Sequence, residues 1–167
     1  SLVKAEAVLK EGRKLSYDRV EYVYELVDVL SAQGKLDEAD RVIEEHASRI
    51  PPPYSYVIKA RFYFLEKKYD LAIESYKQAE TAGYPFWTED NDYIYFMAAA
   101  EKLKDYQTIL RVSQEHISRR GPTAVAYFNQ AAAYYYLGSK DEGRKAYLKA
   151  VALDRTYEKY SSFFTSQ

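Results

Sequence analysis

Residues 123–155 decide the fold of this chain, and they read TAVAYFNQAAAYYYLGSKDEGRKAYLKAVALDR. Small and aromatic residues recur here at helical spacing, with Ala131 and Tyr134 before Gly138 and with Tyr147 after it. This spacing places them on one face of a helix, and the glycine interrupts the pattern. Alanine lets two helices approach closely, and large rings fill the space between them. The stretch therefore predicts two helices joined by a tight turn.

The same arrangement recurs along the chain at a regular interval. The turn positions lie 33, 37 and 34 residues apart, at Gly34, Lys67, Lys104 and Gly138. Prolines form a second, interleaved series at 51–53, 85 and 122. A unit of about 34 residues, split by a turn and ended by a proline-bearing loop, is a helix hairpin. We predict an all-α chain of about nine or ten helices.

This pattern resembles the tetratricopeptide repeat family, in which aromatic and small residues mark both helices, Gly the turn and Pro the exit. An internal match supports the repeat, because EHASR at Glu45–Arg49 returns 70 residues later as EHISR at Glu115–Arg119. The resemblance covers about four units, roughly Val20 to Arg155. It implies a right-handed α-solenoid of stacked antiparallel helix hairpins.

The chain departs from the family pattern at several positions. The Trp of the first helix is absent throughout, Lys67 and Lys104 replace turn glycines, and Gly143 stands where the second helix carries Ala. Pentatricopeptide and Sel1-like repeats remain alternatives. The pentatricopeptide type predicts an RNA-binding charge excess, which this chain lacks.

On this register the chain is one solenoid domain. Its expected parts are a half-repeat at 1–16, repeats at 17–52, 53–86, 87–122 and 123–155, and a capping helix at 156–167. Because 1–16 matches only the second helix of a unit, we expect 1–167 to be part of a longer protein.

The composition excludes several classes of protein. A share of 47% hydrophobic and 29% charged residues is typical of an ordered globular chain. Lys and Arg number 24 against 25 Asp and Glu, so a nucleic-acid partner is not expected. The absence of Cys excludes disulfides and thiolate zinc sites and is compatible with cytoplasm or periplasm. No run approaches the roughly 18 apolar residues of a membrane span, so no membrane insertion is expected.

The sequence shows no constellation of catalytic residues. The two histidines, His46 and His116, fall at equivalent places in second helices of different units, where we expect them to pack. They are too far apart to share one metal ion. We therefore predict no enzyme activity, no cofactor and no metal. Trp87, in the longest interval, is expected to fill the space that the insertion opens rather than to anchor a partner.

The family resemblance implies a partner site on the concave face formed by the first helices. The positions that turn away from their own second helix are Glu21, Tyr24, Glu25, Asp28, Val57, Ile58, Arg61, Phe64, Ile94, Tyr95, Ala98, Glu101, Phe128, Asn129, Ala132 and Tyr135. Aromatic and Arg side chains dominate interface energetics, so the candidate anchors are Tyr24, Arg61, Phe64, Tyr95, Phe128 and Tyr135.

The charged residues among these groove positions indicate which charge a partner would carry. Glu21, Glu25 and Asp28 share one helix face at positions i, i+4 and i+7, which predicts an amphipathic partner with a basic end. The clamp of Lys and Asn with which chaperone-tail binders of the family hold a C-terminal carboxylate is absent.

We predict a non-catalytic interaction scaffold or adaptor that binds a peptide or helix of a protein partner in this groove, within a larger assembly. The alternative is an accessory or regulatory domain of an enzyme whose catalytic part lies outside this segment. Self-association through the N-terminal edge is compatible with either.

Overall fold

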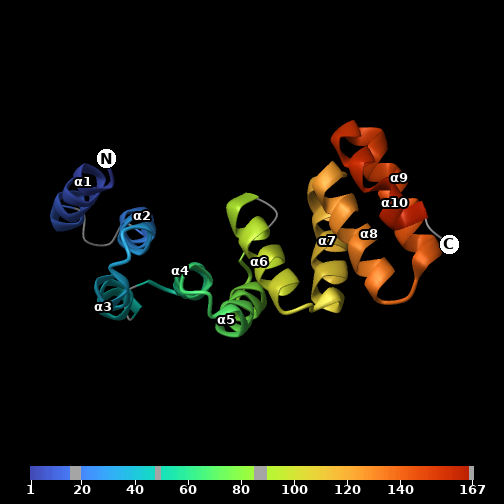
Figure 1. The fold of residues 1–167 in the computed structure, drawn as a ribbon. Helices are drawn as coiled ribbons and strands as arrows, with labels where there is room; N and C mark the ends of the chain where they lie inside the picture. Colours follow the sequence, from blue (N-terminus) through green and yellow to red (C-terminus); the bar gives the residue numbers. More distant parts are fainter. Residues whose placement is uncertain (16–19, 48–49, 85–89, 166–167) are drawn as a thin grey trace. The chain divides into compact units, whose positions relative to one another are not determined.

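The computed structural model describes residues 1–15, 20–47, 50–84 and 90–165. Within these ranges the chain is all-α, with ten α-helices, one 3-10 helix and no strand (Figure 1). The helices are α1 (Leu2–Leu15), α2 (Val20–Ala32), α3 (Leu36–Ala47), α4 (Tyr54–Leu65), α5 (Tyr69–Thr81), α6 (Asp90–Lys102), α7 (Tyr106–Arg120), α8 (Ala124–Tyr136), α9 (Lys140–Leu153), the 3-10 helix η1 (Arg155–Tyr160) and α10 (Ser161–Thr165). The predicted fold class is confirmed.

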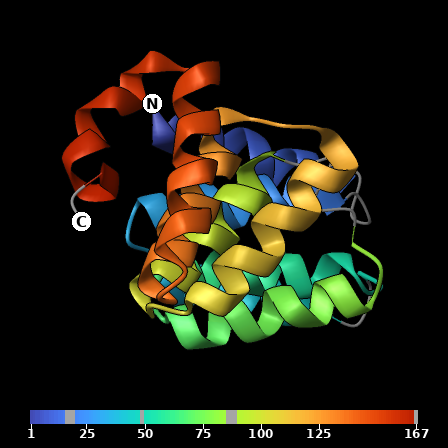
Figure 2. The same ribbon diagram turned by 90° about the vertical axis from the view of Figure 1, so that its right-hand side faces the viewer.

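Contacts divide the chain into two compact units, Ser1–Pro85 and Phe86–Gln167. In the first unit α2 pairs with α3 and α4 with α5, while α1 packs on α2. In the second unit α6 pairs with α7 and α8 with α9, and α7 also packs on α8 (Figure 2). The helices η1 and α10 lie against α9.

A hydrophobic core of the first unit is built around one face of α2. On α2 this face is Val23, Leu26, Val27 and Leu30, at the spacing i, i+3, i+4 and i+7, and all four are at most 1% exposed. Residues of α3 and α4 complete the cluster. The apolar periodicity of the sequence therefore marks the buried face correctly.

All four predicted turn positions adopt the left-handed backbone conformation. The φ angles are 73° at Gly34, 62° at Lys67, 56° at Lys104 and 87° at Gly138. Each turn residue donates its N–H to the carbonyl three residues earlier, and the next residue donates to the carbonyl five residues earlier, as in a Schellman motif. A side chain at such a φ costs energy that Gly avoids, so the two lysines hold strained positions.

The glycine at 143 is explained by the packing of α9 on α8. A Cβ atom at this position would lie 3.0 Å from the carbonyl oxygen of Ala131 and 3.2 Å from the amide nitrogen of Tyr135. Both atoms belong to the α8 backbone, which has no rotamer to change. Gly143 therefore sets how closely the two helices approach.

The segment expected as a cap forms η1 and α10 and packs on the last hairpin. The Tyr147 hydroxyl of α9 donates to the carbonyl of Tyr157 at 3.2 Å. The Tyr147 ring stacks on Phe164 with centroids 4.7 Å apart and planes at 17°. Phe164 is buried as a result.

Candidate partner-binding site

Three of the predicted groove residues meet in the first unit, between α2 and α4. The Arg61 guanidinium carbon lies 4.5 Å from the centroid of the Tyr24 ring, and the Tyr24 hydroxyl donates to the carbonyl of Tyr54 at 3.3 Å. Arg61 also lies 3.9 Å from the Asp28 carboxylate. The acidic stripe predicted on α2 is therefore partly neutralised by a cation of the protein itself.

The other predicted groove residues of the first unit do not take part in this contact. Val57 and Ile58 are buried at 0% and 2% exposure, so they are core residues and not groove residues. The reason is that α4 packs against α2 and α3 as well as its own partner α5, which leaves few positions open. Glu25 is exposed as expected, whereas the Glu21 side chain lies outside the described residues.

Phe64 is half-buried, and its ring packs on its own second helix, with the Tyr69 centroid at 5.6 Å. Trp87 also lies outside the described residues.

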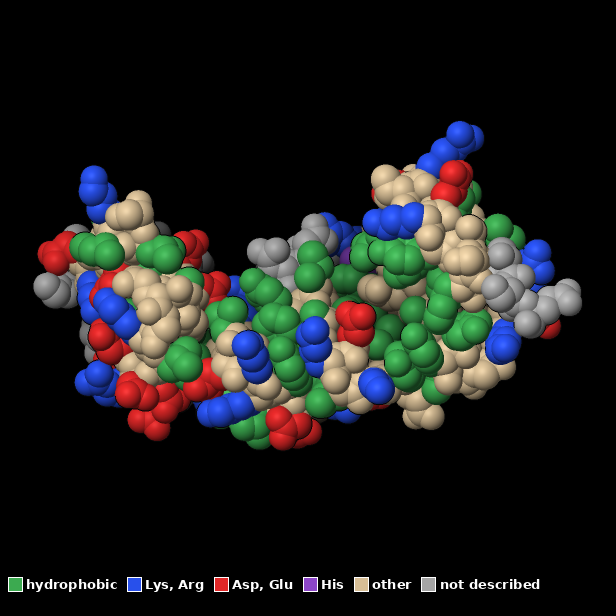
Figure 3. All heavy atoms as spheres, in the orientation of Figure 1, with side chains coloured by type: hydrophobic (Ala, Val, Ile, Leu, Met, Phe, Trp, Pro, Cys, Tyr) green, Lys and Arg blue, Asp and Glu red, His purple; other side chains and the backbone are tan. Residues whose placement is uncertain are grey.

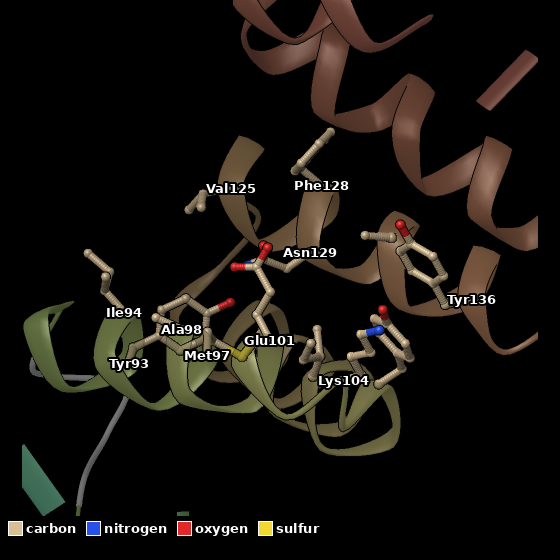
Figure 4. Close-up of a pocket in the computed structure, with 13 residues that line it drawn as sticks. Tyr93, Ile94, Met97, Ala98, Glu101, Lys104, Val125, Phe128, Asn129 and Tyr136 are labelled. Carbon is tan, nitrogen blue, oxygen red and sulfur yellow. The ribbon is translucent and has the colours of Figure 1, made fainter. Parts of the chain in front are cut away.

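The second unit contains a cleft of about 360 Å³ between α6 and α8, and residues at the start of α7 also line it (Figure 4). Among the described residues, those that line it are Tyr93, Ile94, Met97, Ala98, Glu101, Lys104, Tyr106, Ile109, Val125, Phe128, Asn129, Ala132 and Tyr136. The predicted positions Ile94, Ala98 and Glu101 of α6 thus face Phe128, Asn129 and Ala132 of α8. Tyr95 and Tyr135 are not part of this lining.

The cleft is mainly apolar and open to solvent. Ile94 is 52% and Val125 41% exposed, and the two lie at one end, while Lys104 and Tyr136 lie at the other (Figure 4). The space-filling view shows hydrophobic side chains gathered on the second unit (Figure 3).

Local sequence signals position the helices around the cleft. Thr123 caps α8 by accepting a hydrogen bond from the Ala126 amide at 3.2 Å. Asp105 caps α7 by accepting from the Thr108 amide at 3.1 Å. Just before this cap, the left-handed turn at Lys104 ends α6 and places the Lys104 side chain on the cleft.

The α8 wall of the cleft is supported by the C-terminal segment of the chain. The Phe128 ring meets Tyr157 and Tyr160 at centroid distances of 4.7 and 4.8 Å. Tyr135 meets Phe163 at 4.3 Å. Two predicted anchors, Phe128 and Tyr135, are thus partly occupied by the chain's own aromatic side chains, because η1 and α10 fold back onto α8.

Two tyrosines of the cleft have shifted acidities. Burial raises the pKa of Tyr93 to about 12, and the side chain of Asn129 opposes the shift. Burial also raises the pKa of Tyr106, with smaller contributions from Tyr136 and from the charge of Glu101. Both hydroxyls therefore remain protonated at neutral pH.

Sequence reasoning missed several lining residues. Val125 lies one helical turn before Phe128, so continuing the predicted spacing on α8 would have found it, and Tyr136 follows directly on the predicted Tyr135. Tyr106 and Ile109 come from the second helix α7, and no rule that assigns the groove to first helices includes them.

The structure adds three observations on chemistry. His46 and His116 are buried at 1% and 6% exposure, as expected for packed side chains, and His116 stacks on Tyr93 at 4.1 Å. In the part of the chain that the structure describes, no three His, Asp or Glu side chains gather as a metal site would require. Across the same residues, no helix has the length and hydropathy to cross a bilayer.

Comparison with known proteins agrees with this architecture. The Tetratricopeptide repeat family model matches residues 53–82 and 124–157, which contain the α4–α5 and α8–α9 hairpins. These segments are tetratricopeptide repeats, so the resemblance is confirmed. No curated protein sequence matches the chain.

Solved structures share the fold over almost the whole chain. MamA is 18% identical with a TM-score of 0.71, covering 95% of this chain and 92% of its own. BtubC (BKLC) from P. vanneervenii is 18% identical, with a TM-score of 0.70 over 93% of this chain and 74% of its own. TTC0263, a thermophilic TPR protein in Thermus thermophilus, is 16% identical, with a TM-score of 0.64 over 96% and 89%. The chain thus has a tetratricopeptide solenoid fold.

Proposed function

We propose that this chain is a non-catalytic scaffold or adaptor that binds a peptide or helix of a partner protein along its first helices, within a larger assembly. The observation that carries the proposal is the apolar cleft of about 360 Å³ between α6 and α8. Hydrophobic grooves of this kind bind amphipathic helices by burying the apolar side chains that lie on one face of the helix over successive turns.

The exposed apolar residues distinguish this cleft from the outer side of the unit. Ile94 on the first helix α6 is 52% exposed and lines the cleft. Leu148 on the second helix α9 is 54% exposed and does not. The two positions form a matched pair, because a substitution at either one removes a similar exposed apolar side chain.

The test is photo-crosslinking in the organism of origin, with a benzophenone amino acid placed at position 94 or at position 148 of the full chain. We expect a discrete crosslinked protein from position 94 and none from position 148. With the partner identified, Ile94→Asp should weaken binding at least about tenfold and Leu148→Asp less than about twofold, because only the first buries apolar area on binding. Crosslinks from position 148 alone, or from neither, would refute the proposed site.

A further inference from the structure

The cleft of the second unit holds a carboxylate that the described part of the protein does not neutralise. Glu101 lies on α6 and is exposed, and its side chain rises toward Asn129 on α8 (Figure 4). Among the described residues, no hydrogen bond or ion pair engages this carboxylate. Its neighbours along α6 in the lining are apolar, Met97 and Ala98.

A carboxylate without an ion-pair partner discriminates between the partner segments that could bind in the cleft. An apolar segment that covered it would remove water from the charge without replacing it, which is unfavourable. A segment that presents Lys or Arg at this point replaces the lost water with an ion pair. The same group therefore rejects neutral or acidic segments and favours a basic one.

The far end of the cleft carries a positive charge, opposite in sign to that of Glu101. Lys104 lies one turn beyond Glu101, next to the wall formed by Tyr106 and Tyr136, whose rings stack at 4.4 Å and 14°. Within the described ranges its ammonium also makes no ion pair. Opposite charges at the two positions favour one direction of an elongated occupant over the reverse.

We infer that the second-unit cleft binds an amphipathic helix whose apolar face carries one Lys or Arg, which pairs with Glu101. This inference rests on the proposed function and specifies the chemistry of the partner. The helix runs so that its acidic groups or C-terminal carbonyls approach Lys104.

The experiment uses the full chain and a displayed library of random 16-residue peptides of helical pattern, selected at low salt. Each binder is then tested on Ile94→Asp, which removes the apolar end of the cleft. Binders that depend on Ile94 and are enriched in a Lys or Arg flanked by apolar residues support the inference. Binders that depend on Ile94 but show no basic enrichment overturn it and leave the proposed function standing. Absence of any Ile94-dependent binder overturns both.

A charge-swap cycle then locates the contact. Replacing the selected Lys or Arg of a binder by Ala should weaken binding about tenfold on the unaltered protein and less than about twofold on Glu101→Gln, as expected for a partly enclosed ion pair. Glu44→Gln on α3 is the matched control and should keep the tenfold effect, because Glu44 is exposed, makes no ion pair among the described residues and lies outside the cleft. An equal loss on Glu101→Gln and on the unaltered protein would overturn the pairing.

Discussion

Replacing Gly143 by Ala tests whether the approach of α9 to α8 limits the residue at this position. The new Cβ would lie 3.0 Å from the Ala131 carbonyl oxygen, 3.2 Å from the Tyr135 nitrogen and 3.5 Å from the Tyr134 Cβ, whereas ordinary contacts lie at 3.4–4 Å. Relief therefore requires α9 to move away by a few tenths of an ångström. Such a shift loosens the contacts of Ala146 and Tyr147 on the same face.

The magnitude follows from two opposed effects. Overpacking of a tight interface costs about 1–3 kcal/mol. The gain in helix propensity from Gly to Ala returns about 1 kcal/mol. We expect a net loss of about 1 kcal/mol in the free energy of unfolding for Gly143→Ala and a larger loss for Gly143→Val, because Val adds two methyl groups against the same backbone.

Urea unfolding followed by far-UV circular dichroism measures both variants. Arg144→Ala is the control, because Arg144 is the next residue on α9 and is exposed, so this change places Ala at a position that does not face α8. We expect its midpoint to stay close to that of the unaltered protein. A Gly143→Ala protein as stable as the unaltered chain or more stable would show that the helices are not in close contact here, and the explanation of the glycine would be wrong.

Three further predictions concern stability. Lys104→Gly should raise the free energy of unfolding by about 0.5–1 kcal/mol in urea titrations, because Lys104 has a φ of 56° and Gly carries no penalty there; a loss of stability would contradict this. The hydrogen bonds that Lys10, Lys35 and then Gln33 donate to Glu6 lower the pKa of Glu6 from 4.5 to about 2. This pairing stabilises the fold above pH 4.5 and is lost as pH falls toward 2, so the stability difference between the unaltered protein and Glu6→Gln should shrink over that range; a constant difference would contradict it. Phe164→Ala should cost about 3 kcal/mol and lower the near-UV dichroism of the tyrosines, since Phe164 is buried against Tyr147; unchanged stability would mean that the C-terminal segment contributes no packing.

Much of the fold follows from the sequence because its signals are local. The four predicted turns each pass through a left-handed residue, and the spacing identified Lys67 and Lys104 as turns although neither is Gly. The apolar face of α2 follows from helical spacing, and burial confirms it from Val23 to Leu30. These features depend on a few neighbouring residues, so one sequence is enough to predict them.

The candidate site was predicted only in part, because it depends on contacts between helices. Val57 and Ile58 occupy the positions expected to face a groove, yet α4 is covered by α2 and α3 and buries them. Phe128 has the expected position and chemistry, but the sequence does not show that Tyr157 and Tyr160 fold back onto it. A helical register predicts which face a residue occupies and not what covers that face.

The same contacts change which charge is expected to recognise a partner. The sequence points to the acidic stripe of α2, but Asp28 lies 3.9 Å from the Arg61 guanidinium, so a cation arriving at Asp28 is also repelled by Arg61. At the surface two such charges interact by about 4 kcal/mol at an effective dielectric constant of about 20, and attraction and repulsion of this size largely cancel for a third charge nearby. Glu101 has no such cation paired with it among the described residues, and it lines an apolar cleft. The basic group of a partner is therefore expected at α6, and Glu101→Lys should reduce its affinity more than Asp28→Lys does.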